Sequence, residues 1–159
     1  MSAVLPEREE STLLLNPIAS PWQMGIYGAE GFLHESLKME GYVSETLVET
    51  LDRILSQNRI KRILYVSGPG SYMGIKLTYI TLRTLETARG IPFAAVSAFS
   101  LNGGKPLKAM GKLYFVKEKE TIITRKFDEK IPQEFQMPES LNDLEILQDR
   151  EPDYRLPSV

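Results

Sequence analysis

The stretch of the chain best suited to chemistry is a glycine-containing loop, Ser67 to Lys76, which reads SGPGSYMGIK. It follows an apolar run and precedes a segment with helical periodicity. Glycines at such a junction let backbone N–H groups turn toward an anion at the start of the helix, where the helix dipole favours negative charge. The residues that we interpret as a loop resembling a phosphate cradle are Gly68, Pro69, Gly70, Ser71 and Gly74. Glycine also serves tight packing between a strand and a helix, so a purely structural turn is an equal alternative.

The loop matches neither of two common nucleotide-binding motifs. It lacks the frame of a P-loop and its Gly-Lys-Ser/Thr ending, so Lys76 is not placed to reach the β- and γ-phosphates. A dinucleotide fingerprint spaces its glycines differently and places an acid near the end of the next strand, where this chain has Ser97-Ala98-Phe99. The sequence therefore argues against a P-loop NTPase and against a Rossmann dehydrogenase.

Other polar residues give little support for catalysis. His34 is the single histidine and there is no cysteine, so a metal site or a catalytic triad lacks ligands. We expect Ser71 to cap the next helix, because no base is within reach. Asn16 ends the first apolar run, where a nucleotide-binding domain needs a carboxylate, and an amide cannot act as a general base. We therefore predict no catalytic residue, and no cofactor or metal on this chain alone.

Apolar periodicity predicts an α/β domain around the loop. An amphipathic helix is expected at 44–57, with Leu47, Val48 and Leu51 in its buried stripe, and a second helix is expected to run from the loop to about Arg89. Because a strand, the loop, this helix and a further strand follow one another, they form a β-α-β unit with a parallel strand pair. The apolar runs that predict strands are 11–16, 22–27, 31–39, 62–67 and 92–97.

We place the boundary of this domain at residue 103, before a reduced second domain at 104–159. The second part contains a hairpin, 111–116 and 121–127, and a tail whose prolines prevent a long helix, although Ser140 can cap a short one. Residues 128–159 contain nine acidic and three basic residues, a charge of −6, so residues 1–127 carry 16 − 12 = +4.

Composition limits the function classes. The chain has 159 residues and a net charge of −2, which argues against broad attraction to nucleic acid. No run approaches the roughly 20 apolar residues of a membrane span. The first ten residues include Glu7, Arg8, Glu9 and Glu10 in place of an apolar segment, so we do not expect a signal peptide there. We therefore expect a cytoplasmic protein without membrane contact.

Three stretches resemble one family. The block VSGPGSYMGIKLTYITLRTLETARGIPFAAVSAFS closely resembles the Gly-Pro-Gly-Ser-Phe-Thr-Gly-Leu-Arg block, with its following helix and strand, of the bacterial threonylcarbamoyladenosine biosynthesis family TsaB, also called YeaZ. Val43-Ser44-Glu45 resembles the His-Ser-Glu start of the family's first helix. The end of the chain, Glu151 to Arg155 (EPDYR), resembles the family's closing Glu-Pro-x-Tyr-Leu-Arg. The resemblance covers most of 11–103 and this terminal motif.

The resemblance implies an actin-like or Hsp70-like ATPase fold of the ribonuclease H-like type, an α/β fold in which a mixed sheet is flanked by helices. It implies a non-catalytic scaffold, an inactive glycoprotease homologue, in the complex that forms threonylcarbamoyladenosine at adenosine 37 of ANN-decoding tRNAs. The expected partners are a TsaD-like catalytic subunit and a TsaE-like ATPase, which would hold the ATP and the metal, while tRNA is contacted only indirectly. Pairing through the helices also implies a homodimer. The chain departs from the family at Asn16-Pro17, which replaces Asp-Thr, at Val43, and in its shorter second domain.

The helix after the loop has apolar residues on two sides. A helical wheel places Met73, Leu77 and Ile80 on one side and Tyr72, Ile75, Tyr79 and Leu82 on the other. One side must pack on the sheet, and we assign the second to a partner. This predicted interface consists of Tyr72, Ile75, Lys76, Tyr79, Leu82, Arg83 and Glu86. The alternative function is a small-molecule kinase or hydrolase of the same superfamily that uses the glycine loop, which ATP turnover by the purified chain would reveal.

Overall fold

The computed structural model describes residues 9–70, 72–153 and 155. A five-stranded mixed sheet has the order β3-β2-β1-β4-β5. Strands β1 and β2 form an antiparallel hairpin, β3 pairs antiparallel with β2, and β4 is parallel to both β1 and β5. The parallel β4–β5 pair flanks the glycine loop and confirms the predicted β-α-β unit. The elements of this part are β1 (Ser11–Asn16), β2 (Trp22–Tyr27), β3 (Leu33–Met39), α1 (Val43–Gln57), β4 (Ile60–Val66), α2 (Tyr72–Arg89) and β5 (Phe93–Val96).

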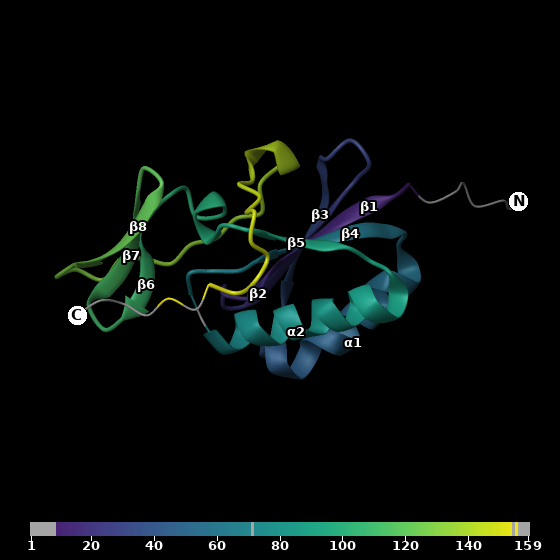
Figure 1. Cartoon of the computed structure of the whole chain (residues 1–159), viewed down its shortest axis with the longest axis horizontal. Helices are drawn as coiled ribbons and strands as arrows, with labels where there is room; N and C mark the ends of the chain where they lie inside the picture. The colour runs from purple at the N-terminus through teal and green to yellow at the C-terminus, as the bar shows by residue number, and fades with distance from the viewer. Residues whose placement is uncertain (1–8, 71, 154, 156–159) are drawn as a thin grey trace, which may run out of the picture.

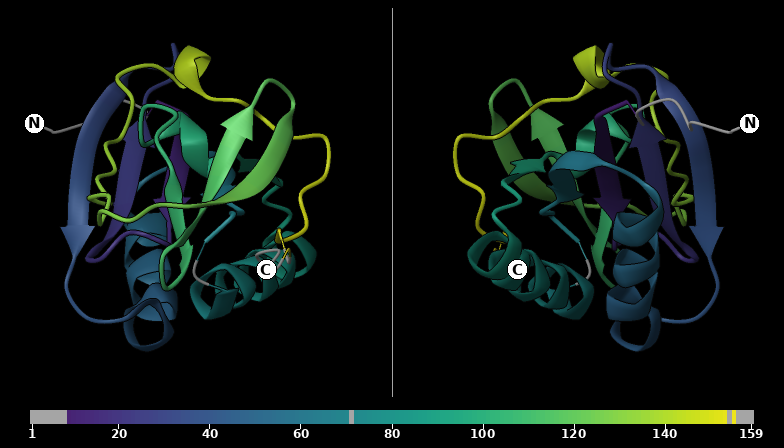
Figure 2. Two further views of the ribbon diagram at one scale, coloured as in Figure 1. Left: turned by 90° about the vertical axis from the view of Figure 1, so that its left-hand side faces the viewer. Right: turned by 90° about the vertical axis from the view of Figure 1, so that its right-hand side faces the viewer.

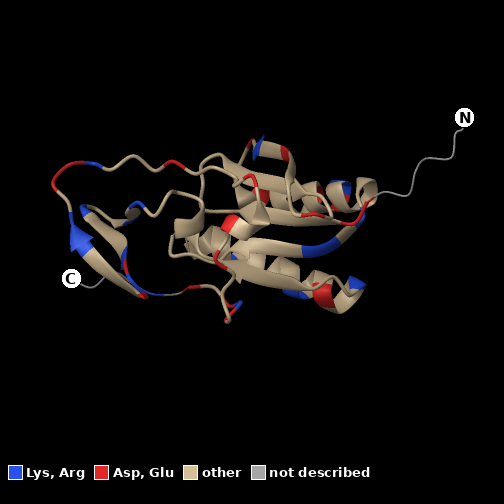
Figure 3. Cartoon of the chain, turned by 90° about the horizontal axis from the view of Figure 1, so that it is seen from above, with Lys and Arg blue, Asp and Glu red and all other residues tan. Residues whose placement is uncertain are grey.

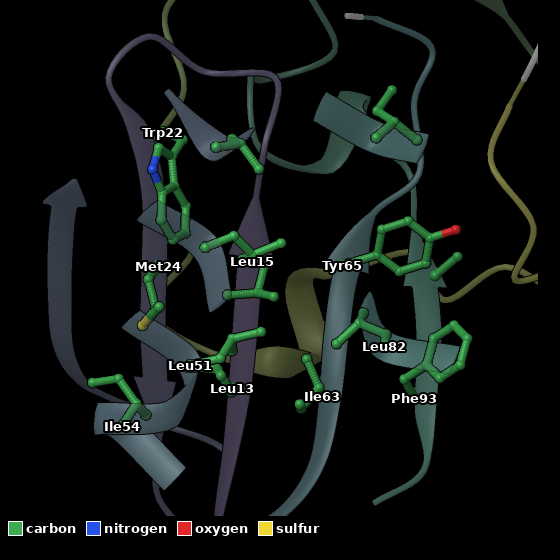
Figure 4. Close-up of a cluster of buried hydrophobic side chains, with 14 of the residues drawn as sticks. Leu13, Leu15, Trp22, Met24, Leu51, Ile54, Ile63, Tyr65, Leu82 and Phe93 are labelled. Carbon is green, nitrogen blue, oxygen red and sulfur yellow. The ribbon is translucent and has the colours of Figure 1, made fainter. Parts of the chain in front are cut away.

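Both long helices cover one face of this sheet, as Figures 1 and 2 show. The central strands are apolar on both faces, because the sheet is covered on both. In β1, Leu13 and Leu15 pack in the cluster beneath the helices, whereas Leu14 belongs to the cluster on the opposite face. Figure 4 shows the first cluster, in which Leu82 of α2 lies with residues of β4 and β5. Burial of a leucine-sized side chain contributes about 1.5–3 kcal/mol, so these contacts fix where the helices lie on the sheet.

A small antiparallel sheet with the order β6-β7-β8 covers part of the opposite face (Figure 1). Leu107 of β6 and Phe115 of β7 join the second cluster there. The pattern predicted a hairpin but missed β6, which is only four residues long and alternates too briefly to be recognised. The elements are η1 (Ala98–Ser100), β6 (Leu107–Met110), β7 (Leu113–Glu118), β8 (Thr121–Lys126) and the short helical turn η2 (Leu141–Asp143).

The last part of the described chain, residues 139–153, which we call the strap, crosses from one edge of the large sheet to the other. The N–H of Leu33 donates to the carbonyl of Glu139 beside β3. Ile146 forms a bridge with Val96, and the N–H of Leu147 donates to Ala95, so the strap also covers the β5 edge. The boundary at residue 103 stays a prediction, since the strap joins the C-terminal part to the first sheet. No helix in the described part of the chain has both the length and the apolar composition to cross a bilayer.

Candidate functional site

The glycine loop connects the end of β4 to the start of α2 and is packed tightly by its own chain. A Cβ on Gly70 would lie 2.9 Å from Cγ2 of Ile18, and a Cβ on Gly74 would lie 3.0 Å from the carbonyl oxygen of Pro17. Gly68 has a φ of +122°, and a Cβ there would lie 3.0 Å from Cβ of Asp153. These close approaches account for all three glycines without a ligand. Binding of an anion stays a prediction, and Ser71 lies outside the described residues.

The strap and the residues after β5 hold the loop through backbone hydrogen bonds. The N–H of Asp153 donates to the carbonyl of Ser67 at 2.8 Å, and the N–H of Ala98 donates to the carbonyl of Gly68 at 3.1 Å. The carboxylate of Asp153 accepts from Nε of Arg155 at 2.8 Å. The hydroxyl of Ser67 is buried without a hydrogen-bond partner in the described structure. The surrounding chain therefore holds the loop in place, and a cavity of about 470 Å³ lies beside Pro69 and Gly70.

Asn16 has a structural role that the sequence did not indicate. Its side chain is fully buried, donates through Nδ2 to Oε1 of Gln23 at 3.3 Å and accepts the N–H of Ile18 at 3.3 Å. These bonds shape the turn between β1 and β2, which places Ile18 against Gly70. The amide thus occupies the end of the first strand for packing, where a carboxylate would be needed for phosphate chemistry.

His34 lies on the surface, away from the loop. Its Nε2 is 4.0 Å from a carboxylate oxygen of Glu9, and both side chains are more than half exposed. Within residues 9–70, 72–153 and 155, no three histidine, aspartate or glutamate side chains group closely enough to hold a metal ion. The sequence contains no cysteine to extend such a group.

Helix α2 packs on the sheet with the side that we had assigned to a partner. Ile75 and Leu82 are each 1% exposed and Thr78 is fully buried, whereas Met73 is 71% and Ile80 50% exposed. The assignment of Ile75 and Leu82 to an exposed interface is therefore wrong. A helical wheel shows which residues share a side, but the position of the loop and of strands β4 and β5 determines which side meets the sheet. Thr78 is tolerated there because its hydroxyl donates to the carbonyl of Gly74 at 2.8 Å.

The other residues of the predicted interface have mixed surroundings. Tyr72 is 48% exposed, with the ammonium of Lys76 5.7 Å from its ring centre. Tyr79 is partly buried, its ring centre 5.9 Å from that of Phe93, and its hydroxyl accepts a hydrogen bond from Arg83 at 2.7 Å. Their membership of an interface stays a prediction.

Glu86 is turned toward the strap, where Arg150 binds both of its carboxylate oxygens at 2.6 and 2.9 Å. This hydrogen bonding lowers the pKa of Glu86 and raises that of Arg150. The guanidinium of Arg150 also lies 4.3 Å from the ring centre of Phe93, and its carbonyl accepts from the hydroxyl of Tyr65. The side of α2 that carries Glu86 is therefore held by the chain itself.

The outward side of the two helices carries an exposed apolar surface, which we call the helix surface: Tyr42, Val48, Met73 and Ile80, with exposed fractions of 75, 66, 71 and 50%. Val48 had been predicted in the buried stripe of α1, which is wrong, because α1 turns Leu47, Leu51 and Ile54 to the sheet. Beside this surface is a groove of about 500 Å³, between the turn 17–22 and the first residues of both helices. In the sequence, the apolar residues of each helix spread over a wide stripe, which indicates that the sheet can bury only part of them.

Exposed charges border the helix surface with opposite sign on its two helices. Glu45, Glu49 and Asp52 are exposed on α1 together with one cation, Arg53, whereas Lys76, Arg83 and Arg89 are exposed on α2. Over the molecule as a whole, acidic and basic residues are dispersed in the view of Figure 3 and do not gather into one basic patch. This distribution agrees with the small net charge and suits contact with another protein more than contact with a nucleic-acid backbone.

Comparisons with known proteins identify the fold. No protein-family model matches the chain, and no curated protein sequence matches it significantly. The solved structure of YeaZ from Pseudomonas aeruginosa is similar with a TM-score of 0.55 and 12% identity, over 79% of this chain and 72% of that one. An uncharacterized protein with similarity to peptidase YeaZ from Pseudomonas aeruginosa gives a TM-score of 0.59 and 12% identity, over 79% and 71% of the two chains. The chain therefore has the fold of these YeaZ structures, built on a mixed five-stranded sheet and two helices.

Proposed function

We propose that this protein is a TsaB-type scaffold subunit of the complex that forms threonylcarbamoyladenosine on tRNA, and that it binds a TsaD-like catalytic subunit. In this proposal the five-stranded sheet and its helices are the first half of an actin-like ATPase fold, and β6–β8 are the reduced remainder of the second. The fold similarity to YeaZ and the glycine-loop block support this assignment.

The observation that carries the proposed role is the exposed helix surface. Monomeric proteins rarely expose large contiguous apolar patches, and such patches mark interaction sites. Tyr42 and Met73 line the same groove, Val48 and Ile80 lie farther along α1 and α2, and each of the four is at least half exposed. Interface energy is concentrated in a few buried apolar and aromatic anchors, so these side chains are the ones that we expect a partner to bury.

The packing of the glycine loop argues against the kinase or hydrolase alternative. Ile18, Pro17 and Asp153 pack against the three glycines, and the cavity of about 470 Å³ beside Pro69 and Gly70 is lined mainly by apolar side chains, which do not bind phosphate. Asn16, in place of a carboxylate, donates one hydrogen bond to Gln23 and accepts one from Ile18. We infer that the chain has no catalytic activity of its own, and that ATP and metal are handled by the TsaD-like and TsaE-like subunits.

The same helix surface would serve a homodimer when the TsaD-like subunit is absent. The mainly acidic row on α1 and the basic residues on α2 are complementary to a second helix pair with the same charges. We therefore expect the two assemblies to compete for one surface, and we expect tRNA to be held mainly by the catalytic subunit.

The test is binding of the full chain to a TsaD-like subunit from the same genome, measured by calorimetry. Met73→Asp should weaken binding about 30-fold or more, the loss typical of an interface anchor. Phe32→Asp is the matched control, because Phe32 is 60% exposed but forms a bridge with Ser140 just before β3 and does not line the groove beside the helix surface. The scaffold assignment is rejected if the wild-type chain does not bind, and the surface assignment is rejected if both variants bind alike.

A further inference from the structure

The proposed interface does not explain the terminal motif, Glu151 to Arg155. The strap contains the first three residues of this motif. The second half of the strap contacts the large sheet, helix α2 and the glycine loop within a few residues. Leu147 packs in the cluster beneath the helices, and Pro152 is buried. This part of the chain is therefore a packed element, although it contains no regular secondary structure.

Among the described residues of the strap, Arg150 makes the polar contact with α2. Its guanidinium binds both oxygens of Glu86 and stacks on Phe93, while its own carbonyl is fixed by the hydroxyl of Tyr65. A planar guanidinium that is bidentate and stacked has few alternative positions, so it defines the lateral position of α2 better than a single exposed ion pair does. Figure 1 shows the strap, in yellow, passing beside α2 before the chain ends.

The contact with the glycine loop follows three residues later. The N–H of Asp153 donates to the carbonyl of Ser67, and Asp153 Cβ lies against the bare α-carbon of Gly68. The carbonyl of Gly68 accepts the N–H of Ala98, so a shift of Asp153 changes the bonding of the whole turn. Three residues of extended chain span at most about 10 Å, so the contacts of Arg150 and Asp153 lie on one short segment of the strap.

We propose that the strap is a mechanical coupling between helix α2 and the glycine loop: displacement of α2 at Glu86 is transmitted through Arg150 and Asp153 to the loop. A partner that displaces α2 at the helix surface would thereby change the conformation of the glycine loop. This last step rests on the proposed function. The coupling itself is a property of the free chain.

Native-state hydrogen exchange of the full chain, without any partner, tests the coupling. Arg150→Met removes the bidentate pair and the stacking. It should speed exchange of the amides at the end of α2 and of Asp153 and Ala98 together, by about twofold to fivefold. If only the amides of α2 respond, the strap anchors the helix but does not couple it to the loop, and the proposal is overturned.

Two further variants make the result specific. Arg125→Met breaks an ion pair with Glu118 and should leave α2 and Ala98 unchanged, since both residues lie on the β7–β8 hairpin. If Arg150→Met unfolds the chain, Arg150→Lys is the second variant: it keeps a positive charge for Glu86 but loses the planar bidentate contact, and it should speed exchange at both places by a smaller factor. A response at α2 without a response at Ala98 also overturns the coupling. Failure of the TsaD-like subunit to bind would overturn the proposed function while leaving this result intact.

Discussion

The two apolar sides of helix α2 have similar residues and opposite surroundings. Ile75 and Leu82 are enclosed by the sheet, whereas Met73 and Ile80 are exposed and no other described element covers them. The two sides differ because only one of them faces β4 and β5. Burial on the first side contributes to folding, whereas the second side is exposed and is the side on which we propose that a partner binds. Residue type alone therefore does not distinguish a core residue from an exposed apolar residue on such a helix.

The largest effect that separates the two sides is on stability. Leu82→Ala should lower the free energy of unfolding by about 2–5 kcal/mol, because it removes buried methyl groups and leaves a cavity. Ile80→Ala should change it by no more than about 0.5 kcal/mol, as for other surface substitutions. Urea unfolding of both variants measures this difference. Equal losses would mean that the two sides are not distinct.

The comparison also shows what the sequence could predict. Apolar runs bounded by turn residues located β1 and β2, and apolar residues at helical spacing together with the flanking glycines located α1 and α2, each within one or two residues. The choice between Leu82 and Ile80 could not be made, because it depends on how the loop directs the helix. The contact of Asp153 with Gly68 joins residues that are far apart in sequence, and no local pattern indicates such a contact. The tight packing of the glycine loop was therefore predicted only as one of two alternatives, a structural turn or a loop resembling a phosphate cradle.

The glycine loop and the turn that packs on it allow a second test of whether a residue is needed for packing or for binding. Gly70→Ala should destabilise the chain by about 1–3 kcal/mol, because the added Cβ overlaps Ile18 and forces it to shift. If this overlap is the cause, the same substitution should cost less in an Ile18→Ala background, where most of the side chain of residue 18 is missing.

A thermodynamic cycle of the wild type, the two single variants and the double variant isolates this interaction. Additive losses would show that Gly70 is needed for another reason, such as a bound anion. In that case inorganic phosphate should stabilise the wild type and not Gly70→Ala, which a thermal melt with and without phosphate would reveal.

The smallest expected effect concerns the side of α2 that faces the strap, between the buried and the exposed sides. Arg150 lowers the pKa of Glu86 in the folded chain, first by hydrogen bonding. A carboxylate with a lowered folded pKa adds stability that is fully present above its unfolded pKa and is lost as the pH falls through the folded pKa. Wild type should therefore exceed Glu86→Gln in stability at neutral pH, and this excess should shrink on acidification below about pH 4.3. The excess should be small, because both side chains are partly exposed to solvent.

Glu49→Gln, an exposed carboxylate on α1, is the control and should show no such loss. Urea unfolding at several pH values measures both variants, and an excess that stays constant to low pH would show that Glu86 contributes through packing instead of through its charge.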